Sequence, residues 1–177
     1  FLGETLLFPD DPRFAGKAIP IRNIIIVLTL SLLFPLLHFI KKRGRRYPVW
    51  LDNLYLSIFW LDMAGNSFNL YNTYFYFDLV SHFHGTGAIA VVLSLILRNS
   101  ISVRNTYLYS SFLANTIHAL LEVQEYYTDV FWGTHNVRGF FDTAGDFIAG
   151  ILGTAVYILI YLFIRSRSVN LSNQKTK

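Results

Sequence analysis

The sequence predicts an all-α, polytopic membrane protein that folds as one helical bundle of about five transmembrane helices. Hydrophobic residues make up 53% of the 177 residues and charged residues only 15%, whereas a soluble domain carries about 25% charged residues. Apolar segments of about 20 residues, the length that a helix needs to cross a bilayer, recur along the chain. Lysines and arginines gather after the first, third and fifth of these segments, which is the pattern that membrane topology imposes.

We expect the transmembrane helices at residues 21–40, 49–69, 78–97, 103–125 and 141–164. Helices are predicted because a lone strand leaves its backbone unsatisfied in lipid, and the alternation of a membrane barrel is missing. Pro35 is expected to kink the first span, because proline removes a helical hydrogen bond. Residues 1–20 are expected to lie along the outer interface and residues 165–177 to form a polar cytoplasmic tail, so that residues 1–177 make a single integral membrane domain.

Basic residues set the predicted orientation. The ones that follow the first, third and fifth spans are Lys41, Lys42, Arg43, Arg45, Arg46, Arg98, Arg104, Arg165, Arg167, Lys175 and Lys177. Five alternating spans place all of them on one side, which should be the cytoplasm. The N-terminus is therefore expected outside and the C-terminus inside, in a bacterial cytoplasmic (inner) membrane. The lipid bilayer is the expected partner, with other membrane subunits or a homo-oligomer as further partners, and no nucleic acid is expected.

Acidic residues have the opposite bias and lie near the predicted outer ends of the spans. On the fourth span, Asn115, His118, Glu122 and Glu125 share one face within an arc of about 80°. The third and fifth spans begin with polar residues spaced four apart, which share a helix face. A stripe of small residues beside the last pair, Gly145, Ala149 and Gly153, would let a neighbouring helix approach closely. The candidate metal ligands from these three spans are Asp78, His82, His118, Glu122, Glu125, Asp142 and Asp146.

The free-energy cost of a charge in the bilayer indicates where these acidic side chains lie. A charged side chain at the bilayer centre costs about 2.5–3.5 kcal/mol, so the acids should face the bundle interior, where they repel one another. Bound cations or protons would relieve that repulsion. Carboxylate and imidazole on facing helices suit a divalent metal ion such as Zn, Fe or Mn, and His118-x-x-x-Glu122-x-x-Glu125 is a relative of the Glu-x-x-His motif of two-metal bundles. A proton or ion pathway, and interhelical hydrogen bonding by protonated acids, stay open as alternatives.

Missing residue types and motifs exclude several classes of functional site. The chain has no cysteine, which excludes disulfide scaffolds, thiolate metal sites and cysteine nucleophiles. It also lacks a Walker loop, a dinucleotide fingerprint and a nucleophile elbow. His38 is expected to be a packed or interfacial residue. His135 and Arg138 lie in a predicted outer loop, where Arg138 would pair with the acids or bind an anionic headgroup.

A series of short motifs occurs in order along the bundle. They are Leu-Asp-Met-Ala-Gly-Asn at 61–66, Phe-Asp-Leu-Val-Ser-His-Phe at 77–83, Ala-Leu-Leu-Glu at 119–122, Gly-Thr at 133–134 and Asp-Thr-Ala-Gly-Asp at 142–146. Their order and spacing resemble a distant member of the YjdF-type bacterial inner-membrane proteins. The chain departs from that pattern at His135, where glutamine is usual, at Gln124-Glu125, which replaces an aromatic stretch, and in the longer loop before Asp142. The family has no settled activity, so the resemblance implies the fold and the site, not a reaction.

Two functions from different classes are predicted. The first is a metal-dependent enzyme whose carboxylate and histidine site opens near the outer membrane face, where a lipid or lipid-linked substrate would reach it. The alternative is a non-catalytic accessory subunit of a larger membrane complex, either structural or binding a haem or chlorophyll through His82 and His118. A complete transporter is less well supported, because the five predicted spans show no inverted repeat.

Overall fold

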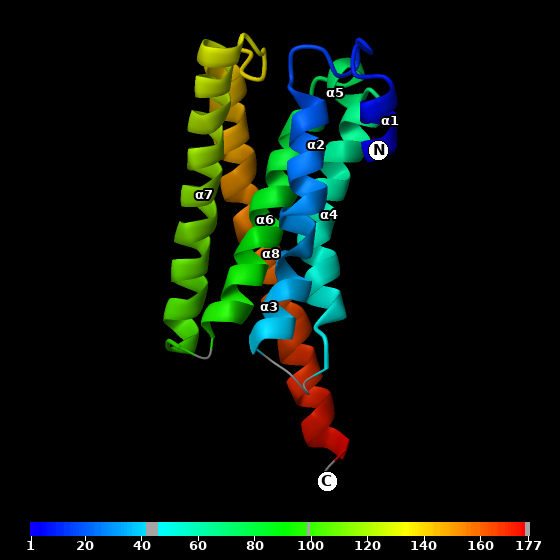
Figure 1. The fold of residues 1–177 in the computed structure, drawn as a ribbon. Helices are drawn as coiled ribbons and strands as arrows, with labels where there is room; N and C mark the ends of the chain where they lie inside the picture. Colours follow the sequence, from blue (N-terminus) through cyan, green and yellow to red (C-terminus); the bar gives the residue numbers. More distant parts are fainter. Residues whose placement is uncertain (42–45, 99, 176–177) are drawn as a thin grey trace.

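Long helices lie side by side in the computed structural model of the chain, which describes residues 1–41, 46–98 and 100–175 (Figure 1). Within these ranges the chain forms helices and connecting loops and no strand. The predicted all-α class is therefore confirmed. Lys42, Arg43, Arg45 and Lys177, which belong to the basic residues used for the predicted orientation, lie outside the described residues.

The helices follow one another with short connections. Their bounds are α1 Leu2–Leu7, α2 Ile19–Leu28, the 3₁₀ turn η1 Leu30–Leu32, α3 Leu33–Lys41, α4 Val49–Ser67, α5 Leu70–Thr73, α6 Phe77–Leu97, α7 Val103–Trp132 and α8 Phe140–Lys175. Helix α7 ends at Gly133, which adopts a left-handed conformation with φ 65°, as glycine often does after a helix. Helix α8 continues into the predicted polar tail, because neither glycine nor proline interrupts it there.

Three helical segments are long and apolar enough to cross a membrane: Ile19–Ile40, Phe77–Leu97 and Phe140–Arg167. These segments correspond to the first, third and fifth predicted spans. Helices α4 and α7 are 19 and 30 residues long, but their composition is more polar, so these two spans are not identified by length and composition. Large apolar side chains such as Ile148 and Leu159 are exposed along α8, which fits an integral membrane protein whose surface contacts lipid.

The first predicted span is a helix with a break. Helix α2 ends at Leu28, η1 follows, and α3 contains Pro35. Because Pro35 has no amide hydrogen to donate to the carbonyl four residues earlier, the helix is weakened in the turn that precedes it, and η1 lies in that turn. The hydroxyls of Thr29 and Ser31 donate to the carbonyls of Ile25 and Val27 beside the break. The expected disruption therefore takes the form of a 3₁₀ turn.

Helix α6 lies at the centre of the bundle and packs against α4, α7 and α8 (Figure 1). Its core contact is made of small and aliphatic side chains, with Ala90 and Val91 of α6 against Ala114 of α7 and Ile158 of α8. The end of the bundle that holds residues 8–18, α5 and the loop 133–139 is called the upper end below, as drawn in Figure 1. The first turns of α6 and α8 lie beside the middle of α7 toward this end, which brings their polar residues together.

Candidate metal centre

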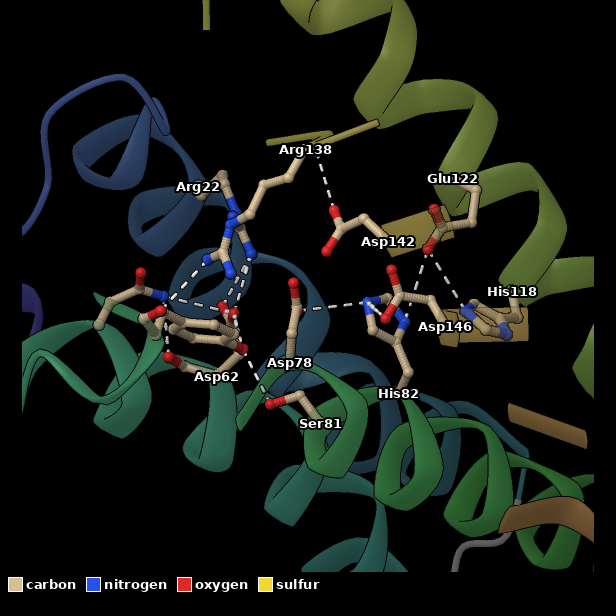
Figure 2. A network of polar contacts seen from close by, with 12 residues as sticks. Arg22, Asp62, Asp78, Ser81, His82, His118, Glu122, Arg138, Asp142 and Asp146 are labelled. Carbon is tan, nitrogen blue, oxygen red and sulfur yellow. Dashed lines mark hydrogen bonds and ion pairs between the residues drawn. The ribbon is translucent and has the colours of Figure 1, made fainter. Parts of the chain in front are cut away.

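Five of the seven predicted ligands come together between α6, α7 and α8 (Figure 2). They are Asp78 and His82 of α6, His118 and Glu122 of α7, and Asp146 of α8. The two residues from α6, like the two from α7, are spaced four apart, so each helix presents both of its side chains on one face. The first turns of α6 and α8 and the middle of α7 therefore contribute the side chains of the cluster.

His82 lies in the middle of this cluster. Its Nε2 atom is 3.4 Å from Oδ1 of Asp78 and 3.8 Å from Oδ1 of Asp146. Its Nδ1 atom is 3.6 Å from Oε1 of Glu122. The two ring nitrogens of His82 therefore face different carboxylates, Nε2 toward α8 and the start of α6, and Nδ1 toward α7.

His118 completes the side of the cluster on α7. Its Nε2 atom is 3.4 Å from Oε1 of Glu122, and its ring stacks on that of His82 with the centroids 4.7 Å apart. The side chain is only 3% exposed, yet neither ring nitrogen makes a hydrogen bond. Glu122 Oε1 and Asp146 Oδ1 are also buried without one. An unsatisfied buried polar atom costs about 1–3 kcal/mol, so a bound ion, proton or water that pairs with these atoms would stabilise the cluster.

The donor atoms form two overlapping groups. His82, His118 and Glu122 make one, and Asp78, His82 and Asp146 make the other; within each, one ligand atom per residue lies within 4.8 Å of the others. Donor atoms around a tetrahedral zinc ion lie about 3.3–3.7 Å apart, as follows from metal–ligand distances of about 2.0–2.2 Å. The separations of 3.4 and 3.6 Å around Glu122 match that spacing. The nitrogen and oxygen donors suit Zn, Fe or Mn.

Glycines of α8 make this arrangement possible. A Cβ atom at Gly150 would collide with the imidazole ring of His118, and one at Gly153 would collide with the backbone of Phe83 in α6. The close approach predicted beside Gly153 is thus present. The glycine that admits His118 is Gly150, which lies one turn before the end of the predicted small-residue stripe and was not singled out from the sequence.

Two of the seven predicted ligands lie outside both groups. Asp142 accepts a hydrogen bond of 2.9 Å from the backbone N–H of Arg138, next to the start of α8 (Figure 2). Glu125 lies one turn beyond Glu122 on α7 and belongs to neither group. The helical repeat places Glu125 near the face that carries His118 and Glu122, but three residues further along α7 than Glu122.

A second polar network borders the cluster and was not predicted as such. The guanidinium of Arg22 on α2 contacts both carboxylate oxygens of Asp62 on α4 at 3.0 and 2.9 Å. The Tyr71 hydroxyl lies 3.0 Å from Asp62 and 2.9 Å from Ser81. Arg22 and Asp62, ionisable residues within two predicted apolar spans, were the available signal, since such residues are expected to pair within a membrane.

The remaining histidines have separate roles. His84 lies 2.9 Å from the Ser57 hydroxyl and 2.6 Å from the Tyr157 hydroxyl, so both of its nitrogens are bonded. The ring of His38 packs edge-on against Tyr47 with the centroids 5.1 Å apart, as expected for a packed residue. His135 donates its backbone N–H to the Gly16 carbonyl at 2.7 Å, which ties the loop 133–139 to the N-terminal segment.

Comparisons with protein-family models, with curated proteins and with solved structures find no match for this chain. The resemblance to the YjdF-type proteins therefore stays a prediction from the motifs. The geometry between α6, α7 and α8 is the basis for the functional proposal.

Proposed function

We propose that this chain is an integral membrane metalloprotein that holds one divalent ion at His82, His118 and Glu122. The observation that carries the proposal is the pair of unbonded nitrogens on His118, a side chain that is 3% exposed. Neutral imidazole nitrogen is a strong ligand for divalent transition metals. An ion among these three residues would also satisfy the buried Oε1 atom of Glu122.

Asp78 and Asp146 have a supporting role in this arrangement. A neutral imidazole carries a proton on only one nitrogen. If Nδ1 of His82 binds the ion, Nε2 carries the proton and points it at Asp78 and Asp146, at 3.4 and 3.8 Å. Metal-binding histidines commonly donate their second N–H to a carboxylate, which fixes the ring orientation and raises ligand basicity.

The proposal includes the five-span topology with the N-terminus outside and the C-terminus in the cytoplasm. Helix α4 has 19 residues and α7 has 30, which correspond to about 28 and 45 Å of helix against a hydrocarbon core of about 30 Å. Polar residues of α7 are directed to the cluster, and Asp62 of α4 is directed to Arg22, which accounts for part of the lower hydropathy of both helices. In this topology the upper end faces outward from a bacterial inner membrane.

The site's place near the upper end supports an enzyme that acts on a lipid or lipid-linked substrate. A divalent ion there would supply Lewis acidity to a substrate oxygen near the headgroup layer. The chain's own residues would orient that ion and exclude lipid tails from it. Distant membership of the YjdF-type family, and association with other membrane subunits or a second copy, are part of the same proposal.

Metal analysis of the purified full-length protein tests the proposal. We expect about one zinc, iron or manganese ion per chain in the wild type and none in His118→Gln. Asp78→Asn should retain the site but weaken metal affinity by about 10–100-fold, as loss of a supporting carboxylate does. His84→Gln on α6 and Asp142→Asn on α8 are the control variants and should bind metal like the wild type. Wild-type protein that takes up no metal after incubation with these ions would contradict the proposal.

The alternative, a non-catalytic accessory subunit, is distinguished by an absorption spectrum. The rings of His82 and His118 stack with their centroids 4.7 Å apart, which leaves no space for a haem or chlorophyll between them. We therefore expect no Soret or Q band in protein purified from the membrane. Such a band would favour the accessory role over the metal-dependent enzyme.

A further inference from the structure

Three cationic side chains from separate parts of the chain meet around Tyr71. The Lys17 ammonium lies 4.7 Å from the centre of the Tyr71 ring. The Arg138 guanidinium donates to the Tyr71 carbonyl at 3.2 Å. Arg22 is the third, and its charge is compensated by Asp62. Within the described residues, neither Lys17 nor Arg138 makes an ion pair with a carboxylate.

The two segments that carry these unpaired cations are fixed to each other. His135 donates its backbone N–H to Gly16, the residue before Lys17. Gly16 has φ 72°, and a Cβ atom there would lie 3.3 Å from the His135 ring. Asp129 accepts hydrogen bonds from the backbone N–H groups of Asn136 and Val137, which holds the rest of the loop. The cations are thus held in place before any ligand binds, which reduces the entropic cost of binding.

The cations border the proposed metal centre. Figure 2 shows the Arg22 and Arg138 side chains pointing toward each other, with Asp78 between them and His82. Burial lowers the pKa of Lys17, and the nearby Arg138 guanidinium lowers it further. The carboxylates of Asp78 and Asp62 oppose this lowering, but within the described residues neither forms an ion pair with Lys17 or Arg138. An anion placed between Lys17 and Arg138 would give both cations a direct partner.

We propose that Lys17 and Arg138 bind the phosphate group of the substrate, beside the ion held by His82, His118 and Glu122. A phosphomonoester carries a charge of about −1.5 to −2 at pH 7, which matches two unpaired cations. Arginine and lysine are the usual ligands of phosphate oxygens. The inference rests on the proposed function for the role of the neighbouring ion, and it assigns a phosphorylated compound as the substrate class. Both a lipid headgroup and a free phosphate ion can supply this phosphate group.

Calorimetric titration of the full-length protein in a neutral detergent tests the inference. The probes are dihexanoyl phosphatidic acid, inorganic phosphate and dihexanoyl phosphatidylcholine. We expect phosphatidic acid to bind more tightly than phosphatidylcholine, and both Lys17→Gln and Arg138→Gln to weaken its binding by about tenfold or more, since each removes a charge-assisted hydrogen bond. Arg98→Gln removes the same charge from the opposite end of α6 and should bind like the wild type.

The other outcomes are also informative. Tighter binding of phosphatidic acid than of inorganic phosphate assigns the site to a lipid headgroup, and equal binding assigns it to a free phosphate; both support the phosphate site. Wild-type affinity in both variants, with their thermal unfolding unchanged, overturns it, as does an equal loss in Arg98→Gln. Metal content separates the two proposals, because Lys17→Gln and Arg138→Gln should keep the ion. Phosphate binding by a protein that takes up no metal would contradict the proposed function alone.

Discussion

Glu122 is a buried carboxylate that lies next to two imidazole rings. It is 5% exposed, and its Oε1 atom lies 3.6 Å from His82 and 3.4 Å from His118 without a hydrogen bond to either. A buried carboxylate between two imidazole rings is stable only when a positive charge or a proton accompanies it. The same rule explains why the negative charge of the Asp62 carboxylate is paired with the guanidinium of Arg22.

Asp129 gives a residue-scale prediction about pH. Burial raises the pKa of Asp129, but hydrogen bonds from Asn136, Thr134 and Val137 outweigh this effect and leave the pKa below its ordinary value of 3.8. Because the pKa is lowered by folding, the carboxylate stabilises the protein above about pH 3.8, and this contribution is lost as the pH falls through the folded-state pKa. The stability difference between wild type and Asp129→Ala should therefore shrink below that pH.

Thermal unfolding in detergent, followed by circular dichroism between pH 7 and pH 2.5, measures this difference. Asp10→Ala serves as the control, because the Asp10 carboxylate accepts no hydrogen bond from the described residues. A difference between wild type and Asp129→Ala that stays constant over the whole range would show that Asp129 does not hold the loop through its charge.

At the scale of elements, glycines set the distance between α6 and α8. A Cβ atom at Gly87 would lie 2.8 Å from the carbonyl of Gly153 and 2.6 Å from the ring of Tyr157. The backbones of the two helices therefore approach closely, as small residues allow in membrane helix pairs. This approach also brings Asp146 of α8 within reach of His82 of α6.

The Gly153→Ala variant tests that packing. Its added methyl group would meet the backbone of Phe83, which cannot move without shifting α6, so we expect a loss of about 1–3 kcal/mol in stability. Gly145→Ala is the matched control on α8, because its methyl group would meet only the flexible end of Leu79. That variant should be neutral or slightly more stable, since alanine favours a helix. Equal unfolding temperatures in detergent for the two variants would rule out the close crossing.

At the scale of the whole molecule, cysteine accessibility tests the orientation. The native chain contains no cysteine, so each introduced thiol reports one position. We expect a membrane-impermeant maleimide to label Asn72→Cys, at the upper end, in intact bacterial cells. Ser100→Cys, between α6 and α7, should react only after the membrane is made permeable. The reverse pattern would place the upper end in the cytoplasm and contradict the proposed outward-facing site.

The sequence predicts part of this fold and site, for physical reasons. The spacing of Asp78 and His82, and of His118 and Glu122, predicts their shared faces, because the helical repeat is local and regular. The choice of helices that meet is not local, so the exclusion of Asp142 from the cluster and the role of Gly150 could not be derived. The pairing of Arg22 with Asp62 depends on α2 lying against α4, which periodicity does not determine.

X-ray absorption at the zinc edge, on protein loaded with one equivalent of zinc, probes the ligands of the proposed ion. We expect a shell of nitrogen and oxygen ligands at about 2.0–2.1 Å with the outer-shell scattering of imidazole. That imidazole signal should disappear or fall sharply in His118→Gln and persist in His84→Gln. A spectrum like that of aqueous zinc, or one that His118→Gln leaves unchanged, would contradict a metal centre between α6 and α7.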